Sequence, residues 1–413
     1  MKDKQAKYPQ LRFKGFTDPW VQRNLGEWSD VRDGTHASPK YIEQGHPMVT
    51  SKNLTDSGLD MSDVSYLTDE DFNEINQRSK VDIGDILFGM IGTIGKPVIV
   101  DRNDFAIKNV ALIKEKTSPE IINTWLIQYL KSPSFERFIQ KENAGGTQKF
   151  IALGLIRDMK LMTPSVQEQT RIGELLNHLD NLIAANQRKL DLLKEQKKGY
   201  LQKMFPKNGE KVPELRFAGF ADDWEERKLS SGLREYTDRV IVEDDKEYSQ
   251  ISVRNNFGGI TLRGSKMGNK IGRKRQAKIN LTKYPQTLIF TRQTVEQGGI
   301  GWVDKYCDGA IVTENMPTIS LDTSVFSKYF LTNLFQTRIF YKNAILDNVE
   351  GGSAQIAIHE SKFLSSTLLF PNLDEQEKIG EFFKQLDKAI ALHQRKLDLL
   401  KEQKKGFLQK MFV

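Results

Sequence analysis

The stretch QRKLDLLKEQKKGYLQKMF at residues 187–205 returns as QRKLDLLKEQKKGFLQKMF at residues 394–412, and Tyr200 against Phe407 is the one difference. Such agreement indicates an internal duplication, so two copies of one plan make up the chain. Both copies keep an apolar seven-residue period. In the first copy the period falls on Ile172, Leu176, Leu179, Ile183, Asn186, Leu190, Leu193, Lys197, Tyr200 and Met204. In the second copy it falls on Ile379, Phe383, Leu386, Ile390, His393, Leu397, Leu400, Lys404, Phe407 and Met411.

An apolar seam with this spacing predicts two long helices that pack on each other in register. At about 1.5 Å per residue each helix would run roughly 55 Å, which is too long for one compact domain. Asn186 and His393 occupy the same seam position, where a polar residue more often fixes the register than binds a metal. The residues expected to pair the helices are Leu179, Ile183, Leu190, Leu193, Leu386, Ile390, Leu397 and Leu400.

Two related motifs, PSVQEQ at 164–169 and PNLDEQ at 371–376, precede the seams. Ser165 with Glu168, like Asn372 with Glu375, has the spacing of a helix N-cap and a carboxylate that returns to the cap. We therefore interpret both motifs as helix starts and not as catalytic carboxylates.

The duplication extends beyond the helices. PQLRFKGFTDPW at 9–20 matches PELRFAGFADDW at 213–224, and a glycine-pair loop follows in each half, AGGTQ at 144–148 and GGSAQ at 351–355. These landmarks predict four parts: a globular domain over 1–163, a long helix over 164–206, a second globular domain over 207–370 and a long helix over 371–413.

Short apolar runs broken by glycine predict strands in the globular parts, at 83–90 (IGDILFGM) and 287–291 (TLIFT). The turn VRDGTH at 31–36 contains Gly34, which could adopt a positive φ. Helices are expected to open at Ser118 and at Ser324. Each globular part is thus expected to be a mixed α+β domain, with strands dominant.

The bulk composition limits the protein class. The chain has 413 residues, a formal charge of +7 and a pI near 9.1, which favours a polyanionic partner. It has no run of 18 apolar residues and no apolar core of a signal peptide near its start, so we expect a soluble, cytoplasmic, multi-domain protein with no membrane contact. Cys307 is the only cysteine, which excludes an internal disulfide.

Enzyme motifs are missing from the sequence. The segment GMIGTIGK at 89–96 has the wrong spacing for a phosphate-binding loop, and Pro97 stands where a hydroxyl belongs. The tracts 195–197 and 402–404 resemble the end of a nuclease metal motif but lack the upstream Pro-Asp, and the five histidines never reach ligand spacing. We expect no catalytic residue, metal or cofactor in this chain.

Basic residues concentrate in the second globular part. Residues 248–295 contain no Asp or Glu, whereas Asn, Gln and Thr alternate with Lys and Arg. Cations neutralise phosphates, and Arg, Asn and Gln can pair with base edges, so this run predicts nucleic-acid binding. The candidate DNA-binding residues here are Arg254, Asn255, Arg263, Lys266, Arg273, Lys274, Arg275, Thr291 and Arg292.

The first globular part fits this hypothesis less well. Residues 56–85 hold nine acids against Arg78 and Lys80 only, a stretch that could instead face a protein partner. If this part also binds DNA, its cations must gather on one face. The candidates for this face are Lys40, Lys52, Asn53, Thr93, Lys96, Lys108 and Lys149.

The chain as a whole resembles the specificity subunit of type I restriction–modification systems. The resemblance is carried by VRDGTH at 31–36, by IGDILF at 83–88, by the two glycine-pair loops and by the doubled helix starts. It covers essentially the whole chain. In the second domain Tyr236 to Asp238 is the nearest remnant of the DGTH motif.

The resemblance implies two target-recognition domains, each reading one half of a split double-stranded DNA sequence. An antiparallel coiled coil with pseudo-two-fold symmetry would hold them apart; from the residues alone, either helix orientation stays open. It also implies two modification subunits that use S-adenosylmethionine to methylate an adenine in each half-site. Restriction subunits, which are translocase–nucleases that use ATP and Mg²⁺, would complete the complex.

Two other functions compete with this expectation. A self-sufficient DNA methyltransferase or nuclease would need a cofactor loop and a catalytic tetrad, and neither is visible in the sequence. A structural coiled-coil adaptor with two protein-binding lobes is compatible with the acidic stretch at 56–85.

Overall fold

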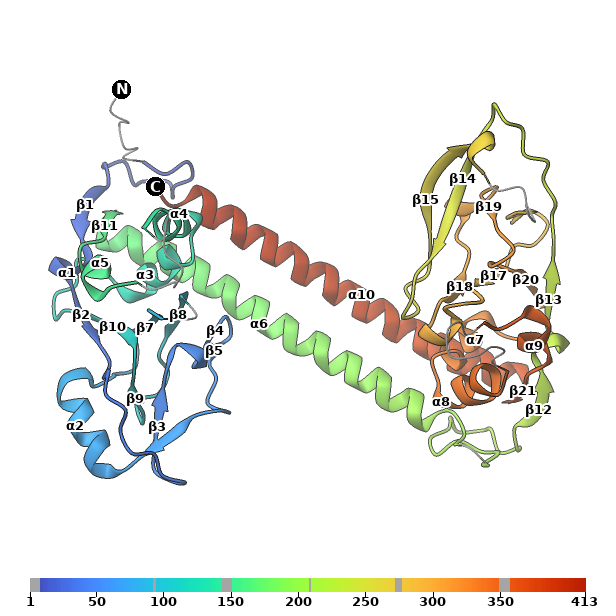
Figure 1. The fold of residues 1–413 in the computed structure, drawn as a ribbon, viewed down its shortest axis with the longest axis horizontal. Helices are drawn as coiled ribbons and strands as arrows, with labels where there is room; N and C mark the ends of the chain where they lie inside the picture. The colour runs from blue at the N-terminus through green and yellow to red at the C-terminus, as the bar shows by residue number, and fades with distance from the viewer. Residues whose placement is uncertain (1–7, 92–93, 143–150, 208, 272–276, 349–356) are drawn as a thin grey trace. The chain divides into compact units, whose positions relative to one another are not determined.

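The computed structural model describes residues 8–91, 94–142, 151–207, 209–271, 277–348 and 357–413. It divides into two compact units (Figure 1). Unit 1 comprises Met1–Lys189 together with Gln394–Val413, and unit 2 comprises Leu190–His393. None of the helices in the described ranges is long and apolar enough to cross a membrane.

The two predicted long helices are present as α6 (Val166–Lys203) and α10 (Leu373–Lys410), and each contributes to both units. In unit 1, Lys404 of α10 contacts Asp180 of α6. In unit 2, Lys197 of α6 contacts Asp387 of α10 at 2.7 Å. From the first contact to the second, the residue number rises from 180 to 197 in α6 and falls from 404 to 387 in α10. The helices therefore run antiparallel.

Burial along the helices follows the seven-residue period. All eight leucines and isoleucines predicted to pair the helices are buried or half-buried. Three leucines outside the period face solvent: Leu192 is 51% exposed, Leu392 65% and Leu399 66%. Every leucine and isoleucine of this pairing set therefore packs, although Leu175, Leu201 and Leu408, which lie outside the period, also reach the two hydrophobic cores.

Unit 1 is built around an antiparallel four-stranded sheet in the order β2-β10-β7-β8, with a three-stranded sheet β6-β3-β9 and two strand pairs, β1-β11 and β4-β5. Its strands are β1 (Val21–Asn24), β2 (Ser29–Asp33), β3 (His46–Val49), β4 (Leu54–Thr55), β5 (Gly58–Leu59), β6 (Ser65–Leu67), β7 (Ile86–Gly89), β8 (Gly95–Ile99), β9 (Ala106–Ile107), β10 (Val110–Glu115) and β11 (Lys160–Thr163). Its shorter helices are α1 (Leu25–Trp28), η1 (Ser51–Asn53), α2 (Asp69–Ser79), α3 (Asn123–Leu130), α4 (Pro133–Glu142) and α5 (Leu153–Arg157).

Unit 2 repeats the four-stranded sheet in the order β13-β20-β17-β18 and adds a second sheet, β15-β14-β19-β16, and the pair β12-β21. Its strands are β12 (Glu225–Lys228), β13 (Leu233–Tyr236), β14 (Glu247–Val253), β15 (Ile260–Met267), β16 (Ala277–Lys278), β17 (Thr287–Phe290), β18 (Ile300–Trp302), β19 (Ile311–Val312), β20 (Thr318–Leu321) and β21 (Thr367–Phe370). Its shorter helices are η2 (Leu229–Ser231), η3 (Gly268–Lys270), η4 (Val295–Gln297), η5 (Lys305–Cys307), α7 (Lys328–Leu334), α8 (Arg338–Phe340), η6 (Tyr341–Ile345), η7 (Leu346–Asn348) and α9 (Glu360–Ser365). The predicted α+β class and the strands β7 and β17 are confirmed.

Each hydrophobic core is closed by the end of a long helix. In unit 1, Phe412 lies 5.9 Å from Trp125 between ring centroids. In unit 2, Phe205 lies 6.0 Å from Trp224 and 5.4 Å from Phe330. The Met-Phe pair that ends each duplicated stretch is therefore a core element in both units.

The caps of the long helices form as predicted, but the carboxylates act differently. Ser165 Oγ accepts the Glu168 backbone N–H at 3.3 Å, and Asn372 Oδ1 accepts that of Glu375 at 2.9 Å. Neither carboxylate completes a capping box, because each is fully buried and binds an arginine of the LRF motif with both oxygens. Arg12 contacts Glu168 at 2.6 and 2.7 Å, and Arg216 contacts Glu375 at 2.7 Å twice.

The shorter helices that follow Ser118 and Ser324 begin later than predicted, at Asn123 in α3 and at Lys328 in α7. In unit 1 the Gln169 amide accepts the Ile122 backbone N–H and donates to the Glu120 carbonyl. Gln376 makes the equivalent contacts in unit 2. The glutamine of each PxxxEQ motif thus holds the incoming backbone extended and delays the helix.

Candidate nucleic-acid interface

The strands β14 and β15 form a hairpin at the start of the acid-free run (Figure 1). From Leu262 to Met267 every residue of β15 is exposed, including Arg263 and Lys266. Within the described part of the chain, Arg254, Arg263 and Lys266 have no carboxylate at ion-pair distance. Their charge is therefore free to neutralise phosphates.

The hairpin tip, residues 254–259, docks on the loop that joins β17 to β18. The Asn256 backbone N–H donates to the Gln297 carbonyl at 2.7 Å, and that of Phe257 donates to the Gly298 carbonyl at 2.9 Å. The Asn255 amide donates to Gln297 Oε1 at 2.7 Å. Sequence reasoning noted both Asn255 and Asn256 in the basic run, kept Asn255 as a candidate, and missed Phe257 and Gln297. The clustering of amides with Gly258 and Gly259 in a short loop was the available signal.

The predicted residues Thr291 and Arg292 occupy a structural position in unit 2. Arg292 contacts Glu360 at 2.5 Å, and both side chains are largely buried, with 12% and 14% exposure. Thr291 is half-buried, and its backbone N–H binds the Gly299 carbonyl. We therefore leave both residues out of the interface. Arg273, Lys274, Arg275, Thr93, Lys149 and the two glycine-pair loops lie outside the described residues.

The candidates in unit 1 are largely occupied by contacts of their own. Lys52 pairs with the exposed Asp63 at 3.0 Å. Asn53 is 3% exposed, and its amide binds the carbonyls of Asp60 and Asp63, so it cannot reach a base in this conformation. Lys108 donates to Ser38 at 3.0 Å.

Two further lysines of unit 1 have different settings. Lys40 is exposed. Lys96 has a positive φ of 49° and lines a cavity of about 570 Å³ with Lys131 and Asp180.

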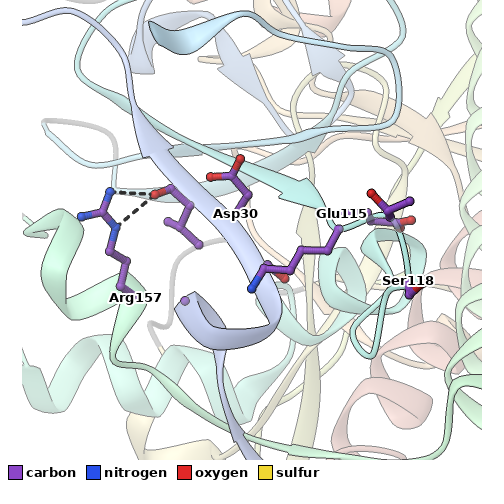
Figure 2. A pocket seen from close by; sticks show the side chains of 9 residues that line it. Asp30, Glu115, Ser118 and Arg157 are labelled. Carbon is purple, nitrogen blue, oxygen red and sulfur yellow. Dashed lines mark hydrogen bonds between the residues drawn. The ribbon is translucent and has the colours of Figure 1, made fainter.

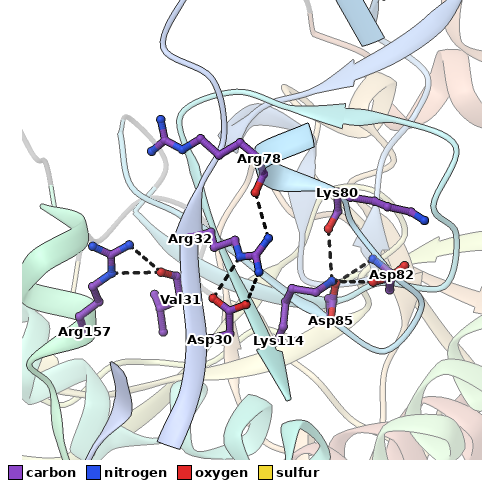
Figure 3. Close-up of polar contacts among 9 residues, drawn as sticks. All are labelled: Asp30, Val31, Arg32, Arg78, Lys80, Asp82, Asp85, Lys114 and Arg157. Carbon is purple, nitrogen blue, oxygen red and sulfur yellow. Dashed lines mark hydrogen bonds and ion pairs between the residues drawn. The ribbon is translucent and has the colours of Figure 1, made fainter. Parts of the chain in front are cut away.

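Part of the acidic stretch is neutralised inside unit 1 (Figure 3). Lys114 contacts Asp85 and, at 2.8 Å, Asp82. Its ammonium lowers the pKa of Asp82, whereas burial raises that of Asp85. Arg32 binds Asp30 with two nitrogens and the Arg78 carbonyl with a third. Asp82 and Asp85 of the acidic stretch thus serve contacts within the unit, which weakens the case for an acidic protein-binding lobe.

The VRDGTH motif forms a charged cluster at the end of β2. His36 Nε2 lies 2.9 Å from Asp33, its Nδ1 lies 2.7 Å from Asn109, and Arg78 also contacts Asp33. The Asp33 hydrogen bond, followed by that of Asn109, raises the pKa of His36. Gly34 does not take the positive φ that the turn suggested. It is required because a Cβ there would lie 2.4 Å from the Ile107 carbonyl oxygen.

A hollow of about 850 Å³ opens beside the first residues of β2 (Figure 2). Asp30, Glu115, Ser118 and Arg157 line it, so both charge signs are present. The Arg157 guanidinium is engaged by the Val31 carbonyl at 2.8 and 3.0 Å. In the residues that are described, no group of three His, Cys, Asp or Glu side chains could hold a metal ion.

Comparisons with known proteins agree with this geometry. The family model "Type I restriction modification DNA specificity domain" matches residues 12–195 and 241–402. The MjaVIII type I restriction enzyme specificity subunit of Methanocaldococcus jannaschii is 23% identical, over 92% of this chain and 91% of that protein. A second protein of that organism, provisionally named the MjaX type I specificity subunit, is 22% identical over 98% of this chain and 95% of its own.

A crystal structure of the type I restriction–modification S subunit from M. genitalium shares the fold. Its TM-score is 0.62, with 13% identity, covering 98% of this chain and 99% of that one. The matched residues include parts of both units and most of α6 and α10. The duplicated frame, the exposed basic hairpin and the matched residues lead to one conclusion: this chain belongs to the type I restriction–modification DNA specificity family and serves as a DNA sequence-specificity subunit.

Proposed function

We propose that the chain reads a bipartite DNA target, with one half-site for each unit. The observation that supports this is the contrast between a repeated frame and divergent outer sheets. Both units keep the same four-stranded order and the same buried arginine–glutamate pair, Arg12–Glu168 and Arg216–Glu375. Both also have a phenylalanine that closes the core, Phe412 in unit 1 and Phe205 in unit 2; these shared features are the frame. Outside this frame, the sheet β6-β3-β9 of unit 1 and the sheet β15-β14-β19-β16 of unit 2 share one antiparallel and one parallel pairing. They differ in length, because β14 and β15 have 7 and 8 residues where β3 and β6 have 4 and 3. A shared frame with different outer surfaces suits two different half-sites.

In unit 2 the contacts to DNA divide by chemistry. Arg254, Arg263 and Lys266 would neutralise phosphates and set the position of the duplex. The exposed amides of Asn255 and Asn256 would face base edges, where an amide can both donate and accept. In unit 1, Lys40 and the His36–Arg78 cluster are the corresponding candidates.

The long helices would set the distance between the half-sites. Each has 38 residues, or about 57 Å at 1.5 Å per residue. At 3.4 Å per base pair this corresponds to roughly one and a half turns of DNA. We expect a target with a fixed, unread centre.

The chemistry would come from partners. Two modification subunits carrying S-adenosylmethionine would methylate an adenine in each half-site, and restriction subunits using ATP and Mg²⁺ would cleave. The chain itself would contribute no catalytic group; it would position these subunits through the outer faces of α6 and α10.

Methylation mapping tests the proposal. The chain is expressed with candidate modification subunits in a host that lacks adenine methylation, and the genome is sequenced by a method that detects N6-methyladenine. We expect methylation at a split motif only when this chain is present. Exchanging residues 21–163 for those of a relative, which leaves Arg12 and Glu168 in place, should change one half of the motif. A stable complex that methylates nothing and ignores DNA would instead indicate a structural adaptor.

Salt dependence of binding tests the phosphate contacts. Arg263→Ala and Lys266→Ala should each reduce the slope of log K against log salt by about 1 for the assembled complex. Lys207→Ala is the matched control, because this lysine of the same unit is 61% exposed and already pairs with Glu214. Equal slopes in all three variants would remove the hairpin from the interface.

A further inference from the structure

The tip of the β14–β15 hairpin exposes an aromatic ring among polar side chains. Phe257 is 42% exposed, and its neighbours Arg254, Asn255 and Asn256 are exposed as well. The surrounding groups, a guanidinium and several amides, suit phosphates and base edges. An exposed aromatic ring beside these groups could stack on a base.

The backbone holds this ring in a costly conformation. Asn256 and Phe257 have φ values of 55° and 56°, so two successive non-glycine residues occupy the left-handed region. That region is unusual for a bulky residue, and such conformations persist where surrounding contacts enforce them. Here the hydrogen bonds to the Gln297 and Gly298 carbonyls enforce it. Two backbone hydrogen bonds thus fix the tip on the loop between β17 and β18.

The residue beneath the ring must be glycine. A Cβ at Gly298 would lie 3.1 Å from Phe257 Cε2 and 3.0 Å from the Phe257 backbone N, and Gly298 itself has a φ of 76°. Phe257 Cε2 therefore lies close to the Gly298 backbone, while 42% of the residue stays exposed. A rigidly supported, exposed ring loses little conformational freedom on binding, which favours affinity.

We propose that Phe257 stacks on, or wedges between, bases of the half-site read by unit 2, and so determines specificity. The inference rests on the proposed half-site function and deepens it. Apolar side chains inserted at a base step unstack it, and flexible steps such as pyrimidine–purine deform most easily. Phe257 therefore selects bases by stacking and deformability, while the neighbouring amides select by hydrogen bonding.

The charge of the region favours DNA over a protein partner. Residues 248–295 contain no acid, and Arg254, Arg263 and Lys266 on the same hairpin are unpaired within the described residues. A protein that docked on Phe257 would have to face this positive charge. Duplex DNA supplies both the phosphates for the cations and the rings for the phenylalanine.

Binding and fluorescence together test the inference. The full chain in complex with its modification subunits is titrated against the duplex found by methylation mapping and against a random duplex of equal length. Phe257→Ala should weaken target binding about tenfold or more, with an unchanged salt slope because no cation is lost. Phe257→Trp should retain binding, and its fluorescence should be quenched by the target duplex.

Three controls separate the alternatives. Tyr341→Ala removes an aromatic side chain of similar exposure, 40%, from another part of unit 2 and should leave target binding unchanged. Phe257→Gly suits the left-handed backbone and should bind as poorly as Phe257→Ala, which excludes loop misfolding as the cause. Arg254→Ala should change the salt slope, unlike both.

Each contrary result has a defined meaning. Unchanged target affinity in Phe257→Ala, or an unquenched Phe257→Trp, overturns the inference and leaves the half-site function intact. Loss of subunit assembly with normal DNA affinity assigns the ring to a protein partner and overturns it as well. A wild-type complex that does not distinguish target from random duplex refutes the half-site function itself.

Discussion

The two units use the same joints to hold different surfaces. Arg12–Glu168 in unit 1 and Arg216–Glu375 in unit 2 have nearly the same geometry, and both glutamates are fully buried. By contrast, the candidate cations differ in their partners. Lys52 of unit 1 pairs with Asp63, whereas Arg263 and Lys266 of unit 2 have no ion pair within the described residues. The two copies have thus kept the residues that assemble the frame, whereas the residues that face outward differ between them.

Variants of the two buried arginine–glutamate pairs should have the largest effect on stability. Arg12→Ala and Arg216→Ala each leave a buried carboxylate without its partner, which costs about 3–5 kcal/mol in unfolding free energy. Denaturant unfolding, followed in each unit by its own tryptophan signal, measures the loss. Arg227→Ala is the control, since its partner Glu225 is 70% exposed and such pairs contribute about 1 kcal/mol or less. Equal losses of unfolding free energy in all three variants would show that the two buried ion pairs stabilise the units no more than an exposed pair does.

The Lys–Asp contacts between the long helices should come next and should differ between units. Lys197→Met removes a charged hydrogen bond from Asp387 and should cost about 1.5–3 kcal/mol. Lys404→Met should cost less, because Lys131 lies near Asp180 and can neutralise part of its charge. Lys197 also donates to Gln336 Oε1 at 3.3 Å, so its loss leaves a second acceptor without this bond. A double-mutant cycle with Asp180→Asn and Asp387→Asn measures both couplings. A larger coupling in unit 1 would contradict this assignment.

Four helical glycines form a natural comparison. Gly199 and Gly406 have open space where a Cβ would stand, so Gly→Ala there should stabilise by about 0.5–1 kcal/mol through helix propensity alone. A Cβ at Gly173 would lie 3.0 Å from the Thr124 carbonyl, and one at Gly380 would lie 2.9 Å from the Phe330 backbone N. Alanine should therefore destabilise both of these sites, Gly380 more than Gly173. Thermal unfolding of the four variants checks the order.

The smallest effect should be a pH dependence confined to unit 1. The pKa of His36 is raised, above all by Asp33, so its contact with Asp33 stabilises the folded state fully below the unfolded pKa of about 6.5. This contribution is lost as pH rises through the higher folded pKa. His36→Gln should thus destabilise unit 1 more at pH 5.5 than at pH 8.5, and unit 2 at neither. An equal loss at both values would mean that the ring acts only by packing.

Local patterns predicted the frame well. The seven-residue period and the caps at Ser165 and Asn372 depend on residues a few positions apart, and both appear in the structure. The arginine partner of Glu168 is 156 residues away, so spacing could not reveal it. A coincidence in the repeat could have: both copies carry LRF before the domain and EQ at the helix start.

The interface was harder to predict because charge in a sequence does not tell which cations are already paired. Arg292 belongs to the basic run, yet Glu360 lies 68 positions away and neutralises it. Asn53 has suitable chemistry, yet the fold uses its amide to hold two carbonyls. Phe257 was missed because its exposure follows from a left-handed backbone that the sequence does not display.

The closure of unit 1 by Met411 and Phe412 imposes an order on biosynthesis. Residues 190–393 form unit 2 without interruption, so that unit can fold as soon as the ribosome releases it. The site beside Trp125 stays empty until residues 394–413 have been made, which happens more than two hundred residues after Lys189. Until then unit 1, whose synthesis begins first, has an open apolar site. Unit 2, whose synthesis begins later, is therefore the first to complete its core.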